Sequence, residues 1–481
     1  MTTRLTAPQL DRAVGAVLGM AAGDALGAGY EFGPPLAEDA TVTMAGGGGF
    51  GWAPGEWTDD TSMAVPILRE LAAGADLAEE ASLDRIVAAW ADWARTAPDV
   101  GIQTRQVLAS IGRHGGATAE AARASARAVH DASGRSGGNG SLMRTAPVAL
   151  AFLADGQEVA LAETARAVSG LTHVDEDAGD ACVIWCLAIR HAIRTGELDI
   201  QVGIDGLPEE RRNRWVALIT DAETRQPRDF AKNGWVVEAL QGAWSAITHG
   251  GDLVDVLERA VRGGRDTDTV AAIAGALAGA VRGGSGVPFR WRRILHGWPG
   301  LDADELTIAA ILAARRGRPD AHGWPASPRF DYSGFAGGRL AAHPHDDGVL
   351  IGSVDALDHL PGEVDAVVSL CRLGSEQVPA RIPAAMRHRV WLIDVADPAE
   401  NPHLDEVLRD AADSVAALRA EGRTVLLHCV EARSRTPIVA AAYAALHLGV
   451  PAGQALNDVL AALPHARPNA GFLEAFPRIV R

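Results

Sequence analysis

The feature that most constrains how this 481-residue chain can fold is a change of hydrophobic pattern near residues 314–330. Before it, from about residue 10, apolar residues recur at helical spacing, as on the face formed by Val236, Leu240, Trp244 and Ile247. After it, short β-type runs alternate with helical stretches, a pattern typical of an α/β domain. The chain is also longer than one hydrophobic core usually serves, so we predict a multidomain protein.

A segment rich in arginine, glycine and proline, around residues 315–325, is typical of a linker. We therefore predict an all-α domain over residues 1–318, followed by a small α/β domain over residues 328–481. In the second domain, strands are expected at 348–351, 364–370, 390–395 and 425–427, and helices at 404–420 and 438–448.

Two apolar stretches of the first domain are expected to be core helices. Residues 10–26 carry internal charges, which predicts a first helix and not a signal peptide. Residues 270–281 form a run far shorter than the roughly 20 residues that span a bilayer. Gly275 and Gly279 within this run would let a neighbouring backbone approach closely, which suits a central helix.

The composition argues against several classes of partner. A net charge of −17 repels phosphate backbones, so free nucleic acid is not an expected partner. Four cysteines are too few for a disulfide framework in so long a chain. We expect a cytoplasmic protein without a membrane partner. Nearly all of its positive charge is arginine, which indicates a GC-rich and bacterial genome.

Two acidic tetrads, some 200 residues apart, each precede a predicted helix: Thr58-Asp59-Asp60-Thr61 and Asp266-Thr267-Asp268-Thr269. Each offers carboxylate and hydroxyl oxygens without a nearby histidine or cysteine, a donor set that suits Mg²⁺ or Mn²⁺ and not zinc. Either tetrad alone is better explained as helix capping. Two of them in one helical domain favour a metal site, although capping and ligation can coexist.

Five short motifs resemble the ADP-ribosylglycohydrolase family, in the family's order, over about residues 10–315. They are residues 23–27 with Glu31, residues 57–61, residues 139–144, Thr172-His173 and residues 266–269. The resemblance implies an all-α hydrolase with two Mg²⁺ ions, Mn²⁺ being the alternative. Such an enzyme releases ADP-ribose from a modified protein or small molecule by hydrolysing an N- or O-glycosidic bond.

The same resemblance implies roles for particular residues. Glu31, Asp59 and Asp60 would act in catalysis by positioning or activating water, and a solvated loop acid is an equal alternative for Glu31. Asp24 is expected to have a structural role. Arg265 stands where relatives often carry a smaller residue, which would change the approach of substrate. The implied metal ligands are Thr58, Asp59, Asp60, Asp266, Asp268 and Thr269.

A glycine-containing segment is the candidate substrate-binding loop. Asn139-Gly140-Ser141 follows Ser136-Gly137-Gly138, whose missing side chains would let backbone N–H groups approach a pyrophosphate. A plain flexible loop is the alternative. His173 would contact the ribose or the diphosphate, or else be a structural histidine. Cys182 and Cys186, one helical turn apart, are expected to be core residues.

The second domain contains a cysteine and an arginine with five residues between them. Residues 425–437 predict a strand, a loop and a helix, with Cys429 at the start of the loop and Arg435 at its end. A helix N-terminus favours the Cys429 thiolate and would bind a phosphate that Arg435 grips, with Thr436 assisting the thiolate as leaving group. Over about residues 330–481 the chain resembles the dual-specificity and tyrosine phosphatase superfamily.

This second resemblance implies a phosphorylated substrate and a general acid upstream of the cysteine. Asp397 is the candidate acid, and Asp394, inside an apparent strand, is the reserve. Ala432 replaces a glycine usual in the family; if the position needs a positive φ, alanine strains or reshapes the loop. A phosphate-binding or scaffolding domain without turnover is the alternative.

Two alternatives to the hydrolase hypothesis stay open. The chain could be a reader that binds ADP-ribose and phosphate without turning either over. It could also be a phosphatase with the helical domain as a targeting arm. Retention of all six ligand-type residues argues against the first alternative, and Ala432 argues against the second.

Overall fold

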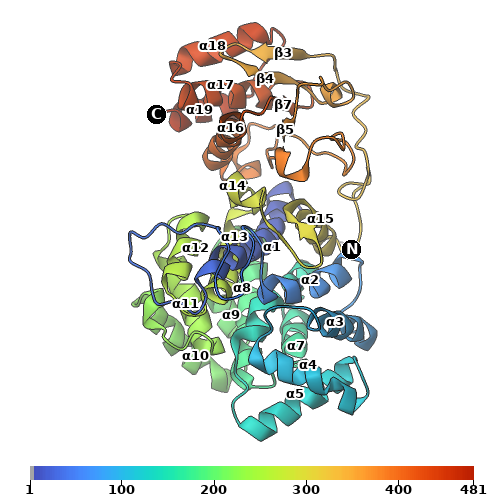
Figure 1. Cartoon of the computed structure of the whole chain (residues 1–481), viewed down its shortest axis with the longest axis vertical. Helices are drawn as coiled ribbons and strands as arrows, with labels where there is room; N and C mark the ends of the chain where they lie inside the picture. The colour runs from blue at the N-terminus through green and yellow to red at the C-terminus, as the bar shows by residue number, and fades with distance from the viewer. Residues whose placement is uncertain (1–4) are drawn as a thin grey trace. The chain divides into compact units, whose positions relative to one another are not determined.

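The computed structural model describes residues 5–481 and divides into two compact units (Figure 1). Unit 1 comprises Met1–Val287 and Ile294–Arg318, and unit 2 comprises Pro288–Arg293 and Pro319–Arg481. The short segment Pro288–Arg293 therefore groups with unit 2, although it lies within the sequence range predicted for the first domain.

Unit 1 is helical almost throughout, as predicted, but it is not purely α. A small antiparallel ribbon pairs β1 (His296–Gly297) with β2 (Leu301–Asp302). The α-helices are α1 (Ala7–Gly27), α2 (Asp59–Ala72), α3 (Glu80–Trp93), α4 (Ile102–Ser110), α5 (Ala119–Ser133), α6 (Leu142–Thr145), α7 (Glu158–Ser169), α8 (Glu176–Thr195), α9 (Gln201–Asp205), α10 (Glu209–Glu223), α11 (Val236–His249), α12 (Leu253–Arg262), α13 (Thr267–Arg282) and α15 (Ala303–Ala314).

Helices α1 and α13 pack against each other along glycines of both helices. A Cβ atom added to Gly19 would lie 2.3 Å from the carbonyl oxygen of Gly275, and one added to Gly27 would lie 2.5 Å from the Cα of Asp268. No side chain fits at these points, so the two backbones themselves are in contact. Gly275 and Gly279 of α13, which predicted the close approach of a neighbouring backbone, do lie against the backbone of α1.

The length of α1 raises the question of a membrane span. Ala7–Tyr30 is long and apolar enough to cross a bilayer, but 89% of its apolar window is buried within the structure. The N-terminus of α1 is fixed by a capping box in which Thr6 and Gln9 each accept a hydrogen bond from the other's backbone N–H. Its apolar character is therefore accounted for by its place in the core of unit 1.

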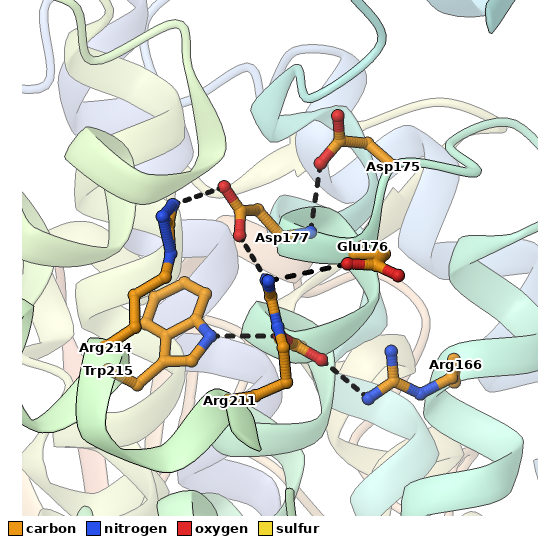
Figure 2. Close-up of polar contacts among 8 residues, drawn as sticks. Arg166, Asp175, Glu176, Asp177, Arg211, Arg214 and Trp215 are labelled. Carbon is orange, nitrogen blue, oxygen red and sulfur yellow. Dashed lines mark hydrogen bonds and ion pairs between the residues drawn. The ribbon is translucent and has the colours of Figure 1, made fainter. Parts of the chain in front are cut away.

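A network of ion pairs fixes the N-terminus of α8 against α10 (Figure 2). The buried carboxylate of Asp180 accepts hydrogen bonds from Arg166 and Arg211 and from the indole N–H of Trp215. Asp177 accepts from Arg211 and Arg214. Buried charge is tolerated here because each carboxylate has charged or N–H donors.

Unit 2 contains a five-stranded sheet in the order β3-β4-β7-β5-β6, parallel except for β3. The strands are β3 (Leu340–His343), β4 (Asp346–Ser353), β5 (Ala366–Ser369), β6 (Arg387–Arg389) and β7 (Val425–Cys429). Its helices are α14 (Phe289–Arg292), α16 (Leu404–Ala420), α17 (Arg435–His447), α18 (Ala452–Ala462) and α19 (Ala470–Ile479).

The central strand β7 is buried on both faces of this sheet. Val425 and Leu427 join the larger hydrophobic cluster with the helices, whereas Leu426 joins a smaller cluster on the opposite face. Alternation of side chains along a strand produces this division. The carboxyl end of β7 therefore emerges, with Cys429, from the middle of a sheet that is covered on both sides.

The predicted strand at residues 390–395 is wrong. The strand in this region is β6, which ends at Arg389, and the chain then leaves the sheet. The carbonyl of Leu392 accepts a hydrogen bond from Arg435, and the backbone N–H and C=O of Ile393 both bind the side chain of Asn401. These backbone groups are thus satisfied by side chains and not by a neighbouring strand.

Candidate active site

Both acidic tetrads of unit 1 meet the carboxyl-terminal part of α1. The buried carboxylate of Asp24 accepts hydrogen bonds from the backbone N–H of Thr58 at 2.8 Å and of Thr61 at 2.9 Å. The hydroxyl of Thr267 donates to the carbonyl of Gly27 at 2.9 Å. The end of α1 therefore holds the starts of α2 and α13 beside each other.

The carboxylates at this junction form two groups that share one residue. Asp24, Asp60 and Asp268 form one group, and Glu31, Asp266 and Asp268 form the other, with ligand atoms within 4.8 Å of one another in each. Three carboxylates so close together repel each other strongly unless cations or protons neutralise them. Sharing of Asp268 is the arrangement expected of two neighbouring divalent ions.

Helix capping does not account for the two tetrads. Thr58 and Asp266 occupy the N-cap positions of α2 and α13, yet neither side chain makes a capping hydrogen bond. The Thr58 hydroxyl lies instead 3.2 Å from Oδ2 of Asp60 and 3.3 Å from Oδ2 of Asp268. The Thr58 side chain therefore lies against the carboxylate groups, and Asp266 is itself a member of one of them.

Burial and mutual repulsion disfavour the charged carboxylates. Burial raises the pKa of Asp24 to about 6 and, together with nearby carboxylates, that of Glu31 to about 9. Burial and then the charge of Asp60 raise the pKa of Asp268 well above its ordinary value. Within residues 5–481, one oxygen each of Glu31, Asp60 and Asp268 is buried without a hydrogen-bond partner. A hard divalent cation would satisfy these oxygens, so the residues fit such an ion.

Asp59 lies in the site but outside both carboxylate groups. Its Oδ2 accepts a hydrogen bond from the backbone N–H of Gly101 at 3.3 Å. Burial and then the charge of Asp99 raise the pKa of Asp59. Asp99 also raises the pKa of Glu31, so its charge acts on both carboxylates. Asp99 was not predicted as a site residue, because its only signal is an isolated acid in the loop between α3 and α4.

Two asparagines position the second tetrad. The Asn139 amide donates to Oδ2 of Asp266 at 2.8 Å and to the carbonyl of Asn233 at 2.9 Å. The Asn233 amide in turn donates to the carbonyl of Gly264 at 3.0 Å. Thr269 is buried and lowers the pKa of both Asp266 and Asp60, although burial, the larger effect, raises them. Asn139 was predicted to bind substrate, and Asn233 was not singled out by any motif.

The glycine-containing loop lies against a neutral histidine. Cβ atoms added to Gly138 and Gly140 would lie 3.4 Å and 3.2 Å from the His173 ring. Burial and then the charge of Arg144 lower the pKa of His173 well below its ordinary value. The buried Arg144 donates to the carbonyl of Gly140 and to the Thr172 hydroxyl, which contacts His173 Nδ1 at 2.7 Å. Arg144 thereby fixes both the loop and the imidazole.

Ser141 differs from its neighbours in the loop. Its hydroxyl is fully buried and accepts a hydrogen bond from the Cys182 thiol at 3.6 Å. Cys182 and Cys186 are both buried, as predicted. The Ser141 side chain therefore faces the core and Gly140 faces His173.

Unit 2 presents Cys429 at the end of β7, before a loop that leads into α17. Among the described residues, no acceptor binds the backbone N–H groups of residues 430–434, although the carbonyls of Val430 and Arg433 are bonded. Ala432 adopts φ of +50°, so the position does take the conformation that favours glycine. A loop of free N–H groups at a helix N-terminus suits an anion.

The arginine of this loop faces one of the two candidate acids. Arg435 Nε lies 3.4 Å from Oδ2 of Asp394, and Oδ1 of Asp394 accepts a hydrogen bond from the side-chain amide of Asn469 at 3.1 Å. Asp397 is exposed and caps a short turn by accepting from the backbone N–H of Ala399. The hydroxyl of the buried Thr436 has no hydrogen-bond partner within the described chain. The structure thus brings Asp394, and not Asp397, into contact with Arg435.

The chain resembles known proteins in both of its parts. Residues 5–321 match the family model described as ADP-ribosylglycohydrolase. An ADP-ribosylarginine hydrolase Tri1 of Pseudomonas putida (strain GB-1) is 32% identical over 290 residues, which cover 59% of this chain and 73% of that protein. An ADP-ribosyl-[dinitrogen reductase] glycohydrolase of Rhodospirillum rubrum is 31% identical over 300 residues, covering 60% of this chain and 91% of the relative.

A separate match concerns a shorter stretch. Dual specificity phosphatase 28 of Homo sapiens is 39% identical over 110 residues, which cover 22% of this chain and 59% of that protein. The match supports a phosphatase-like region in the chain. The family model covers most of the chain, and the two glycohydrolase relatives are covered over more than two thirds of their length. The chain is therefore a member of the ADP-ribosylglycohydrolase family, whose enzymes hydrolyse ADP-ribose linkages.

Proposed function

We propose that unit 1 is a magnesium-dependent enzyme that removes ADP-ribose from an arginine side chain of a modified protein. The observation that carries this proposal is the place of Asp268 in both carboxylate groups. A site that only bound ADP-ribose would need the cleft but not two overlapping sets of buried carboxylates. The arginine linkage rests on the relatives, one of which is named an ADP-ribosylarginine hydrolase.

The residues that would hold the ions are the six predicted ones, Thr58, Asp59, Asp60, Asp266, Asp268 and Thr269, joined by Asp24 and Glu31. Bound Mg²⁺ supplies charge that polarises ribose hydroxyls and lowers the pKa of water. Mn²⁺ is the alternative ion, because it accepts the same hard oxygen ligands.

The chain's own residues orient the two reactants. Glu31, a member of one carboxylate group, and Asp59, which lies outside both, would hold the attacking water at the anomeric carbon. The backbone N–H groups around Gly138 and Gly140 would bind the diphosphate beside His173, against which both glycines lie. His173 is neutral and fixed by Thr172, so it offers a hydrogen bond without adding charge.

The test is release of ADP-ribose from an arginine-ADP-ribosylated protein. We expect release with Mg²⁺, and its loss with a chelator and in Asp268→Ala. Asp131→Ala, the same change at an exposed position of α5, is the matched control and should retain full activity. Release by Asp268→Ala at the rate of the control would contradict the metal assignment. Tight ADP-ribose binding without release from arginine-, serine- or small-molecule-linked substrates would favour the reader alternative.

We further propose that unit 2 is a cysteine-dependent phosphatase. The supporting observation is the loop of free backbone N–H groups between Cys429 and Arg435. The Cys429 thiolate would attack phosphorus, and Arg435 would bind the phosphate oxygens bidentately. Because Asp394 lies beside Arg435, we propose it as the general acid ahead of Asp397.

Turnover of p-nitrophenyl phosphate tests this second function. Cys429→Ser should abolish it and leave ADP-ribose release unchanged. Cys371→Ser is the matched control, because Cys371 is a buried cysteine just beyond the neighbouring strand β5. Asp394→Asn should lower turnover more than Asp397→Asn. Turnover that survives Cys429→Ser would show that the thiolate mechanism is wrong.

A further inference from the structure

A carboxylate and an indole ring lie beside Gly137 in the glycine-containing loop of unit 1. Asp175 stands two residues after His173, at the N-cap of α8. A Cβ atom added to Gly137 would lie 3.3 Å from Cγ of Asp175 and 3.3 Å from the indole nitrogen of Trp235. Both side chains therefore lie at the same point of the loop backbone.

The charge of Asp175 is not neutralised, unlike that of the two acids that follow it. Glu176 and Asp177 form ion pairs with Arg211, and Asp177 also pairs with Arg214. Figure 2 shows Asp175 apart from these arginines, with one carboxylate oxygen bonded to the backbone N–H of Asp177 at 2.9 Å. In the part of the chain that the structure describes, no arginine or lysine pairs with its other oxygen.

Backbone hydrogen bonds fix Trp235 at this place. The N–H of Val236 donates to the carbonyl of Gly137 at 2.9 Å, and the N–H of Asn139 donates to the carbonyl of Gly234 at 3.2 Å. Trp235 nevertheless keeps 38% of its surface exposed. A large aromatic side chain that is anchored by its backbone but left open offers a face to a planar ring.

These contacts form one continuous wall. Asn139 touches the metal-site carboxylate Asp266, Gly138 touches His173, and Gly137 touches Asp175 and Trp235. On the proposed function, the ribose that is cleaved lies at the carboxylate end of this wall and the diphosphate lies along the glycines. The adenosine half of ADP-ribose then reaches Asp175 and Trp235.

We infer that Asp175 is a specificity-determining residue that accepts hydrogen bonds from the adenosine ribose and excludes ligands phosphorylated at its 2′-hydroxyl. A carboxylate is a good acceptor for ribose hydroxyls, and it repels a phosphate at the same position. The inference rests on the proposed function. It predicts that unit 1 acts on ADP-ribose groups derived from the unphosphorylated dinucleotide.

Asp175→Asn isolates the charge, because asparagine caps a helix as well as aspartate does. Dissociation constants of free ADP-ribose and of ADP-ribose 2′-phosphate are measured by calorimetry on the full chain with Mg²⁺. We expect the unmodified protein to bind ADP-ribose at least tenfold more tightly than its 2′-phosphate. In Asp175→Asn the two dissociation constants should differ by less than threefold, chiefly because ADP-ribose 2′-phosphate binds more tightly to the variant.

Glu176→Gln is the matched control, since it removes one negative charge from the adjacent residue. Glu176→Gln should leave the ratio of the two dissociation constants unchanged. If the ratio fell as far as in Asp175→Asn, the inference would be overturned, because any nearby negative charge would then repel the 2′-phosphate. Equal affinity for the two ligands in the unmodified protein would overturn the inference and leave the proposed function standing. Failure to bind either ligand would overturn both. Trp235→Ala should weaken the binding of both ligands by the same factor.

Discussion

Asp268 belongs to both carboxylate groups of unit 1, whereas Glu31 belongs to one of them. Removing a shared ligand should therefore affect both ions, and removing an unshared one should affect a single ion. We expect Asp268→Asn to abolish binding of both Mn²⁺ equivalents in calorimetry, and Glu31→Gln to weaken one equivalent only. Asp131→Asn is the control. A full stoichiometry in Asp268→Asn would contradict the shared position.

Ala432 shows how one residue adapts to a glycine conformation. Its φ of +50° costs alanine about 1–2 kcal/mol. Ala432→Gly removes this cost, but it also increases the entropy of the unfolded chain and loses a buried methyl group, about 0.8 kcal/mol for the latter. The net change in the free energy of unfolding should stay within about 1 kcal/mol.

Ala432→Val should lower the free energy of unfolding of unit 2 by about 2 kcal/mol, because a β-branched residue is worse in this conformation and the site is buried. Chemical denaturation monitored on unit 2 checks both variants. A valine variant as stable as the unmodified protein would show that the loop relaxes away from positive φ.

Site residues could be predicted where they repeat a pattern. Thr58, Asp60 and Asp268 stood out because two acidic tetrads each precede a helix, and the structure brings these tetrads together. Asp99 and Asn233 lie singly in loops, so no spacing identified them, and only the fold places them beside Asp59 and Asp266. Asp394 was ranked below Asp397 because residues 390–395 were predicted to be a strand, which the structure does not contain.

At the scale of elements, the contact between α1 and α13 sets the geometry of the carboxylate groups. A methyl group at Gly19 would collide with the backbone of Gly275, which no side-chain rotation can relieve. Gly19→Ala should therefore lower the free energy of unfolding by about 3 kcal/mol or more and weaken Mn²⁺ binding, because α1 carries Asp24. Gly112→Ala, where the added atom meets nothing within 4 Å, is the control.

Thermal unfolding and Mn²⁺ titration of the two variants check this prediction. The informative comparison is between them, since both carry the same chemical change. A Gly19→Ala protein as stable as Gly112→Ala would mean that the helices can separate without cost.

In unit 2, Asp346 at the start of β4 ties the sheet to two helices. It accepts two hydrogen bonds from Arg419 of α16, each at 2.9 Å, and one from Tyr443 of α17 at 2.7 Å. Burial alone would raise the pKa of Asp346, but these hydrogen bonds outweigh it and lower the pKa. The resulting stabilisation is present above the ordinary aspartate pKa and is lost as pH falls through the lowered folded-state pKa.

Asp346→Asn should therefore destabilise unit 2 by about 1–2 kcal/mol at pH 7, less than a fully buried pair because solvent screens part of the charge. The difference between variant and unmodified protein in thermal midpoint should shrink as pH is lowered from 7 toward 3. A difference that stays constant with pH would mean that the ion pair does not contribute.

Helices were predictable where the helical spacing of apolar residues continued over several turns. Strands were predictable where a stretch of apolar residues was unbroken. The helix predicted at residues 404–420 is α16 with the same limits, and the run at 425–427 lies within β7. The antiparallel edge strand β3 was missed because it has only four residues, and none of them is a β-branched or aromatic side chain that indicates a strand. Residues 390–395 have the composition of a strand, but Arg435 and Asn401 bind their backbone groups.

At the scale of the whole molecule, two compact units should respond to different ligands. Mg²⁺ should stabilise unit 1, and an oxyanion such as tungstate should stabilise unit 2, because each binds only the folded form of its own site. A ligand at about 100 times its dissociation constant adds about 2.7 kcal/mol, which corresponds to a rise in midpoint of about 5 °C.

Scanning calorimetry should resolve two transitions, each moved by one ligand only. A chelator should return the Mg²⁺-sensitive transition to its lower midpoint, and Cys429→Ala with Arg435→Ala should remove the response to tungstate. A single transition moved by both ligands would contradict independent sites. Potassium chloride at the same ionic strength controls for screening of the net charge of −17.

The contact between α1 and α13 has a consequence for synthesis of the chain. α1 is translated well before α13, whose Asp268 belongs to both carboxylate groups. Until α13 emerges from the ribosome, Asp24 and Asp60 lack Asp268, and the glycines of α1 lack the α13 backbone. Both carboxylate groups can therefore be completed only after α13 has emerged, so the proposed activity of unit 1 would begin only late in synthesis.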